Sequence, residues 1–160
     1  MRIGIYGAGA IGGLLAVRLA AAGQEVSLVA RGPHLAAMKE RGLTLEDATG
    51  RCTVPVKASA DPAELGAQDY VIVTLKAHQV PGVVGAMQPM LVPETAVVTA
   101  VNGVPWWYFH DLPGPFEGKR LPSVDPGDAQ WNGIGPERVI GCVVYPAAEV
   151  VEPGVVRLVE

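Results

Sequence analysis

The chain has few cysteines and no surplus of positive charge. Its two cysteines, Cys52 and Cys142, lie far apart and form neither a CxxC pair nor a Cys/His cluster, which argues against a zinc site and a disulfide framework. The net charge of −4 offers no basic field for nucleic acid or an anionic membrane. Apolar runs break well before the roughly 18 residues of a membrane span, and residues 1–12 lack the features of a signal peptide. We therefore expect a reduced, soluble, cytoplasmic protein.

What the chain does have is enough apolar sequence for a core. Of its 160 residues 49% are hydrophobic, and the mean hydropathy is +0.29. The sequence contains no internal repeat and no low-complexity tract. Length and composition predict one globular domain over residues 1–160.

A short apolar run at the start of the chain turns directly into Gly-x-Gly-x-x-Gly and then into a helix-forming stretch. In a dinucleotide-binding βαβ unit the first glycine makes the tight turn, the second lets the backbone approach a pyrophosphate, and the third allows close packing of the helix. The pyrophosphate would then lie on free N–H groups at the positive end of the helix dipole. The residues predicted to bind it are Gly7, Ala8, Gly9, Ala10, Ile11 and Gly12.

The second expected strand, residues 25–31, ends on Arg31. NAD enzymes usually place an acidic residue there, which accepts hydrogen bonds from the ribose 2′-hydroxyl. A guanidinium can instead pair with a 2′-phosphate. We therefore predict NADP(H) as the cofactor; the alternative is a solvated arginine at a strand end.

Strand and helix patterns alternate along most of the chain, which predicts an α/β fold of the Rossmann type with a doubly wound, mainly parallel sheet. Helices are expected over residues 10–22, 32–41 and 77–91, and a helical turn over 61–66. Further strands are expected over residues 43–45, 53–56, 70–75, 95–101, 139–145 and 155–159. The helix over 10–22 is apolar on nearly every side, so we expect it to be buried between the sheet and another layer.

Residues 105–136 lose this pattern. Proline, glycine and aromatic residues dominate there, and we expect a packed surface excursion rather than a disordered linker. The aromatic run over residues 106–109 could shield a nicotinamide, although packing is the simpler interpretation. Asp111, Asp125 and Asp128 are expected to be solvated turn residues, because they lack metal-ligand spacing.

Polar residues follow two expected strands directly. Ligands of open α/β sheets bind beyond the carboxyl ends of the strands, so Lys76 and Asn102 are candidate catalytic and cofactor-binding residues. Lys76 offers a positive charge and Asn102 both a donor and an acceptor. The alternatives are a lysine that reaches into solvent and an Asn-Gly turn. His78 is expected to be a surface or packing residue, and Gln79 is only a neighbour of interest.

Taken together, these motifs resemble the amino-terminal half of the ketopantoate reductase family. The resemblance rests on the glycine pattern and on residues 29–32, 73–79, 102–103 and 153–156, in that order. It implies NADPH-dependent reduction of 2-dehydropantoate to pantoate, in pantothenate and coenzyme A biosynthesis. It also implies that Arg31 meets the 2′-phosphate, that Lys76 lies by cofactor and substrate, and that Asn102 holds the substrate end of the site.

The same resemblance implies a second, helical domain that supplies the general-acid lysine, and nothing in the 160 residues matches that domain. We therefore expect a cofactor-binding half with weak or no turnover alone, and an exposed apolar face that self-associates or meets a helical partner domain. Three alternatives stay open. The chain could be a non-catalytic NADP-binding module, a reductase of another 2-keto acid, or a monodomain enzyme with Lys76 as its acid.

Overall fold

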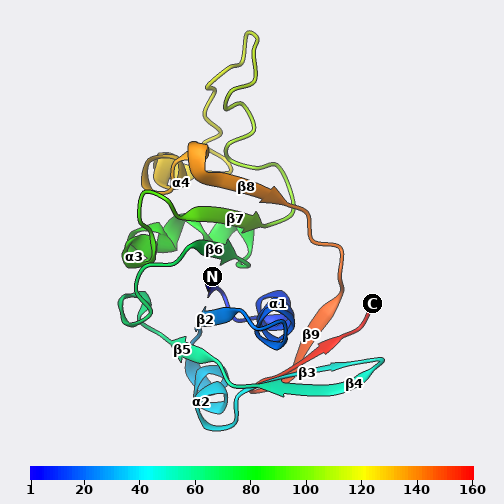
Figure 1. The fold of residues 1–160 in the computed structure, drawn as a ribbon. Helices are drawn as coiled ribbons and strands as arrows, with labels where there is room; N and C mark the ends of the chain where they lie inside the picture. Colours follow the sequence, from blue (N-terminus) through cyan, green and yellow to red (C-terminus); the bar gives the residue numbers. More distant parts are fainter.

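The computed structural model describes residues 1–160 and contains ten strands in two sheets (Figure 1). The strands are β1 (Arg2–Tyr6), β2 (Glu25–Val29), β3 (Leu43–Asp47), β4 (Gly50–Val54), β5 (Lys57–Ser59), β6 (Tyr70–Val73), β7 (Ala96–Ala100), β8 (Val139–Cys142), β9 (Ala148–Glu152) and β10 (Val155–Leu158). The α-helices are α1 (Ala10–Ala21), α2 (Gly32–Arg41), α3 (Val84–Met87) and α4 (Ala129–Gly133). Six single 3₁₀ turns connect them: η1 (Pro62–Glu64), η2 (Ala77–Gln79), η3 (Pro81–Val83), η4 (Gln88–Met90), η5 (Pro126–Asp128) and η6 (Pro136–Arg138).

The larger sheet has the strand order β5-β2-β1-β6-β7-β8, and every neighbouring pair in it is parallel. The order reverses at β1, which lies between β2 and β6. This is the doubly wound Rossmann arrangement, and it confirms the fold class predicted from the sequence. A ligand site is expected where the order reverses, beyond the carboxyl ends of β1, β2 and β6.

A second, four-stranded sheet has the order β4-β3-β10-β9. The hairpin of β3 and β4 matches the two strand pieces expected from the sequence. Its extension by the chain's last two strands was not predicted: β10 pairs in parallel with β3 and antiparallel with β9. The prediction of a single strand after the Pro153-Gly154 turn was incomplete, because β9 on the other side of that turn was missed.

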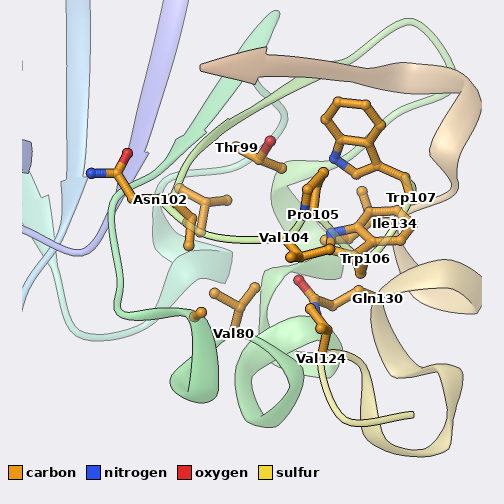
Figure 2. A pocket seen from close by; sticks show the side chains of 13 residues that line it. Val80, Thr99, Asn102, Val104, Pro105, Trp106, Trp107, Val124, Gln130 and Ile134 are labelled. Atoms are coloured by element: carbon orange, nitrogen blue, oxygen red, sulfur yellow. The ribbon is translucent and has the colours of Figure 1, made fainter. Parts of the chain in front are cut away.

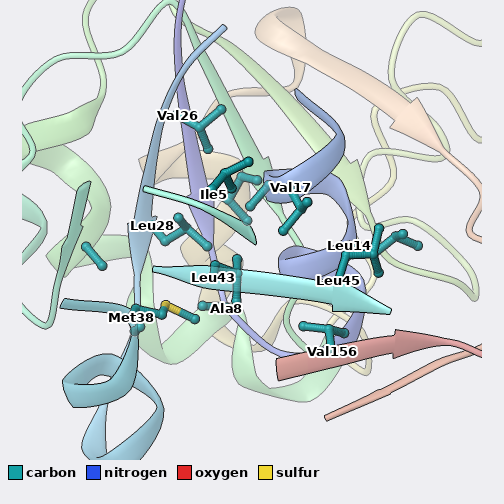
Figure 3. Packing of buried hydrophobic residues seen from close by; sticks show 14 of the residues in the cluster. Ile5, Ala8, Leu14, Val17, Val26, Leu28, Met38, Leu43, Leu45 and Val156 are labelled. Carbon is teal, nitrogen blue, oxygen red and sulfur yellow. The ribbon is translucent and has the colours of Figure 1, made fainter. Parts of the chain in front are cut away.

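Helix α1 lies between the two sheets (Figures 1 and 3). One apolar core surrounds it, with Ile5 and Leu28 from the large sheet and Leu45 and Val156 from the small sheet, all essentially inaccessible to solvent. A Cβ added at Gly13 of α1 would lie 2.4 Å from Cγ2 of Val156, so the helix needs glycine where it crosses β10. This sandwich explains why the helix is apolar on nearly every side.

The region between β6 and β7 contradicts the predicted helix over residues 77–91. It consists of η2, η3, α3 and η4, none longer than four residues. Pro81 is the first residue of η3 and Pro89 the second residue of η4. Each proline interrupts the preceding turn, because it cannot donate the hydrogen bond that would continue it. These short turns cover the other face of the large sheet, where Val73, Val84 and Met87 join a second apolar core.

Residues 105–136 combine a packed base and an exposed tip. Trp106 is 4% exposed, whereas residues 111–120 are all exposed and project away from both sheets (Figure 1). The prediction that Asp125 is solvated was wrong. Asp125 is 3% exposed, and its carboxylate accepts the backbone N–H groups of Gln130 and Trp131 at 2.9 Å, so it holds the first turn of α4.

The predicted strand over residues 139–145 is shorter than expected, since β8 ends at Cys142. No helix of the structure has the length and apolar character that crossing a bilayer requires.

Candidate functional site

The glycine loop lies at the carboxyl edge of the large sheet, with a cleft on each side of it. The first cleft, of about 540 Å³, is bounded by the ends of β1 and β2 and by α2. The second, of about 460 Å³, is bounded by the ends of β6 and β7 and by the segment that leads into β9. Leu75 lines both clefts. An elongated ligand that crosses the glycine loop could therefore enter both.

The three glycines of the loop meet different constraints. Gly7 has a φ of +110°, which residues other than glycine rarely adopt. A Cβ there would also lie 2.8 Å from Leu75. A Cβ at Gly9 would meet nothing within 4 Å, so the open space above this residue is available to a ligand. A Cβ at Gly12 would lie 2.1 Å from the carbonyl oxygen of Gly7, so α1 can pack here only with glycine.

Thr74 ties this loop to the neighbouring strand. Its hydroxyl donates to the carbonyl oxygen of Gly7 at 2.5 Å, from the first residue after β6. Thr74 was not predicted as a site residue, although a hydroxyl directly after a buried strand and two positions before Lys76 is a usable signal. Thr74 fixes the turn in which Gly7 has a positive φ.

The amino terminus of α1 opens onto the clefts without a side-chain cap. The first backbone N–H groups of a helix have no partner within it, and the helix dipole makes this end positive. Together with the open space at Gly9, this end fits the pyrophosphate of a dinucleotide.

Arg31 and His34 form the polar part of the first cleft. Arg31 lies two residues past β2, where it precedes α2 in extended conformation rather than ending the strand, and it is exposed. No carboxylate lines this cleft. Burial raises the pKa of the nearby Tyr6 hydroxyl, and the positive charge of Arg31 opposes that shift.

His34 was not predicted as a site residue. Its Nδ1 accepts the backbone N–H of Gly154 at 2.9 Å, so the ring is neutral with its proton on Nε2. Burial lowers the pKa of His34, and the carbonyl of Ala8 opposes this effect. The side chain thus connects α2, beside the first cleft, with the β9–β10 turn of the small sheet.

Lys76 and Asn102 line the second cleft together, and Lys76 is the only charged residue in its lining. The side-chain oxygen of Gln79 accepts the backbone N–H of Lys76 at 3.1 Å, which gives Gln79 a role in shaping this turn. The amide of Asn102 makes two hydrogen bonds with the main chain of Val144, both of 2.9 Å. One N–H and one lone pair of the amide remain for a ligand.

The predicted residues therefore divide between the clefts. Gly7, Ala8, Gly9 and Arg31 line the first, and Ile11, Lys76 and Asn102 line the second. Ala10 and Gly12 line neither: Ala10 begins α1, and Gly12 lies under the Gly7 carbonyl.

This arrangement is that of a dinucleotide-binding domain, and a comparison with known families decides which one. The family model described as ketopantoate reductase PanE/ApbA matches residues 3–111, which contain β1 to β7 and both sides of the glycine loop. The chain belongs to the ketopantoate reductase family. Members of this family are NAD(P)-dependent oxidoreductases with a Rossmann-type domain, and the resemblance inferred from the sequence is confirmed.

Relatives of this ketopantoate reductase domain extend the match. A 2-dehydropantoate 2-reductase from Mesorhizobium japonicum is 55% identical over 161 residues, which cover 100% of this chain and 49% of that protein. A second one, from Pyrococcus horikoshii, is 34% identical over 105 residues, 65% of this chain and 34% of that protein. The crystal structure of a candidate ketopantoate reductase from Ralstonia solanacearum MolK2 has a TM-score of 0.92 and 45% identity, over 99% of this chain and 49% of that one.

This chain therefore spans about half the length of the Mesorhizobium and Ralstonia proteins that it matches. The family model ends at residue 111, inside the aromatic segment, whereas both of these relatives match through the excursion and the second sheet. Most of the projecting segment over residues 111–120 thus lies beyond the residues that the family model matches.

Proposed function

We propose that this chain binds NADP(H) and forms the cofactor-binding half of a 2-keto acid reductase. The substrate that we propose is 2-dehydropantoate, which would be reduced to pantoate in pantothenate and coenzyme A biosynthesis. The observation that carries this proposal is the pair of clefts on either side of the glycine loop, with Arg31 in one and Lys76 and Asn102 in the other. The names of the relatives support the choice of substrate.

The residues of the first cleft favour the phosphorylated cofactor. Arg31 offers a planar guanidinium that can pair with a 2′-phosphate through two hydrogen bonds. No carboxylate in the cleft repels that phosphate or accepts a hydrogen bond from a 2′-hydroxyl. The pyrophosphate would lie over Gly9 on the N–H groups of the first turn of α1, and Gly12 would act indirectly by letting that turn pack against Gly7.

The second cleft would hold the nicotinamide and the keto acid. When bound, the nicotinamide supplies the hydride that adds to the keto carbon, and the keto oxygen must then receive a proton. The ammonium of Lys76 can stabilise the negative charge on a substrate carboxylate or on the developing alkoxide. Asn102, held by Val144, offers its remaining N–H to the same oxygen.

Lys76 is the only proton-donating cation in this cleft, so we infer that the 160 residues alone turn over slowly or not at all. Full activity would need a proton donor from a helical domain or partner. This would be the second half that the lengths of the relatives suggest.

Calorimetric titration with NADPH and NADH tests the cofactor proposal. We expect NADPH to bind more tightly by about 10- to 100-fold, the value of a charge-assisted pair of hydrogen bonds. Arg31→Gln should remove this preference. Arg51→Gln is the matched control, because Arg51 is an exposed arginine on β4, in the other sheet. Equal binding of both cofactors by the parent chain would refute the role of Arg31.

A second assay tests the half-site proposal, by following NADPH absorbance with 2-dehydropantoate and with other 2-keto acids. We expect rates near background for all of them, and no residual rate in Lys76→Ala. Rapid turnover that Lys76→Ala abolishes would instead show a monodomain enzyme with Lys76 as its acid. Tight NADPH binding without binding of any 2-keto acid would support a non-catalytic NADP-binding module.

A further inference from the structure

A small cavity lies beneath the loop that follows β7, next to the second cleft (Figure 2). Its volume is about 30 Å³, which is enough to hold a group the size of a water molecule. The base of the aromatic excursion forms its roof: Trp106 packs edge-on against Trp131, with ring centroids 6.0 Å apart, and Trp107 lies over Gly141 of β8. No charged side chain lines it.

Two hydrogen-bond donors in this cavity have no partner. The indole Nε1 atoms of Trp106 and Trp107 are both buried and make no hydrogen bond, and Trp106 as a whole is 4% exposed. Figure 2 shows both nitrogens on the sides of their rings that face Val104 and Pro105, toward the middle of the lining residues. Buried N–H groups are seldom left unpaired, because each loses its hydrogen bond to water without replacement.

An acceptor lies on the opposite wall. Gln130 is 4% exposed, and its backbone N–H donates to Asp125 at 2.9 Å, while its side-chain Nε2 lies 3.4 Å from the same oxygen. These contacts direct its amide oxygen toward Trp106, as Figure 2 shows. Thr99 and Asn102 also line the cavity, but their side chains already bond to the main chain of Ile140 and Val144. The two indole donors and the Gln130 acceptor therefore remain for a ligand, and they suit a hydroxyl group better than a methyl group or a carboxylate.

The cavity and the second cleft share the wall formed by Ala77, Val101 and Asn102. Val104, which is 61% exposed, lies at the mouth of the cavity on the same edge of the sheet. A keto acid whose carboxylate lies near Lys76 could therefore extend its tail past Asn102 toward the two tryptophans. We propose that this cavity receives the terminal hydroxyl of the substrate's tail, and that Trp106 and Trp107 select hydroxylated over purely alkyl 2-keto acids.

This inference rests on the proposed function, because it concerns the tail of the same substrate. The selection follows from the unpaired donors. A hydroxyl oxygen accepts from an indole N–H and can donate to Gln130, whereas a methyl group of similar size does neither. One net hydrogen bond predicts severalfold, up to about tenfold, tighter binding of the hydroxylated acid.

Indole resonances in a ¹⁵N-labelled sample give a readout that does not require turnover. With NADPH present, the chain is titrated with 2-dehydropantoate and with 3,3-dimethyl-2-oxopentanoate, in which a methyl group replaces the hydroxyl. We expect 2-dehydropantoate to move the Trp106 and Trp107 indole signals at concentrations severalfold, up to about tenfold, lower than the alkyl acid requires. Trp106→Phe and Trp107→Phe should reduce this difference, and Trp131→Phe, which keeps both donors, should preserve it.

The backbone signals of Lys76 and Asn102 distinguish a failure of the tail site from a failure of the proposed keto acid substrate. If both acids move these signals with equal affinity, or if 2-dehydropantoate moves them without moving the two indoles, the tail site is refuted and the keto acid proposal survives. If the indoles contact only a trapped water molecule that neither acid displaces, the tail site is also refuted. If neither acid moves any signal while NADPH still binds, the tail site and the keto acid substrate are both refuted, and cofactor binding stands.

Discussion

Replacing Gly12 by alanine tests whether close packing at the glycine loop limits the stability of the whole domain. The new Cβ would lie 2.1 Å from the Gly7 carbonyl oxygen and 2.7 Å from the Thr74 hydroxyl. Ordinary contact begins at 3.4 Å, so α1 must move away from β1 or the turn at Gly7 must change. Such overpacking costs about 1–3 kcal/mol, and loss of the hydrogen bond between Thr74 and Gly7 adds about 1 kcal/mol.

Alanine also gains about 1 kcal/mol over glycine as a helix former. The free energy of unfolding should therefore fall by about 1–3 kcal/mol, which lowers the urea midpoint by about 1 M for a chain of this size. Urea titration followed by circular dichroism and tryptophan fluorescence measures this change. NADPH affinity should fall as well, because the first turn of α1 moves.

Gly9→Ala is the matched control, because its Cβ would meet nothing within 4 Å. Alanine is a weaker helix cap than glycine, so the loss of stability should stay below about 1 kcal/mol. Its methyl group would occupy the space proposed for the pyrophosphate, so NADPH affinity should fall strongly in a chain that remains stable. If Gly12→Ala unfolds at the parent's urea concentration, or if Gly9→Ala binds NADPH as well as the parent, the assignment of roles within the loop is wrong.

Three further predictions concern other parts of the domain. Asn102→Ala should lower the free energy of unfolding by about 1–2 kcal/mol, because it leaves both main-chain groups of Val144 without their partner, and urea titration would show an unchanged midpoint if that bridge contributes nothing. Burial holds the folded-state pKa of His34 below its usual 6.5, so the unfolded chain takes up a proton first as the pH falls. The free energy of unfolding should therefore decrease below about pH 6.5, and His34→Asn, which can still accept the Gly154 N–H, should reduce this decrease in urea titrations at several pH values. Tyr145 is 89% exposed on an apolar segment, so the 160-residue chain should self-associate at high concentration and Tyr145→Ser should weaken this; a parent chain that stays monomeric in sedimentation velocity would contradict it.

The parts of the fold that could be predicted from the sequence are those with local patterns. The uninterrupted branched run of β6 and the glycine turn after β1 specify their own structures, because each pattern has few alternatives. The second sheet could not be predicted in the same way. Its pairing of β10 with β3 joins residues about a hundred positions apart, and the local sequence of neither strand indicates which strand it pairs with.

The residues of the candidate site likewise divide into those that a local sequence pattern indicates and those that it does not. Arg31, Lys76 and Asn102 were found because polar residues near the ends of buried strands stand out in the sequence, although their roles remain proposals. His34 was missed because its partner Gly154 is distant in the chain, and Asp125 was misjudged because its surroundings of proline and glycine are typical of solvated turns. His34 accepts one hydrogen bond from a residue 120 positions away, and Asp125 accepts two from backbone N–H groups five and six positions ahead, which no motif in the sequence indicates.

The position of α1 between the two sheets also affects how the domain can fold during protein synthesis. The helix that presents its amino terminus to the clefts leaves the ribosome early, whereas the strands that cover its outer face, β9 and β10, follow more than a hundred residues later. Until Val156 packs against Gly13, one apolar face of α1 stays exposed to solvent. Such an exposed apolar face is a binding site for a chaperone. A nascent chain stopped before β9 would thus carry every glycine of the loop while the helix that follows the loop still lacks part of its packing.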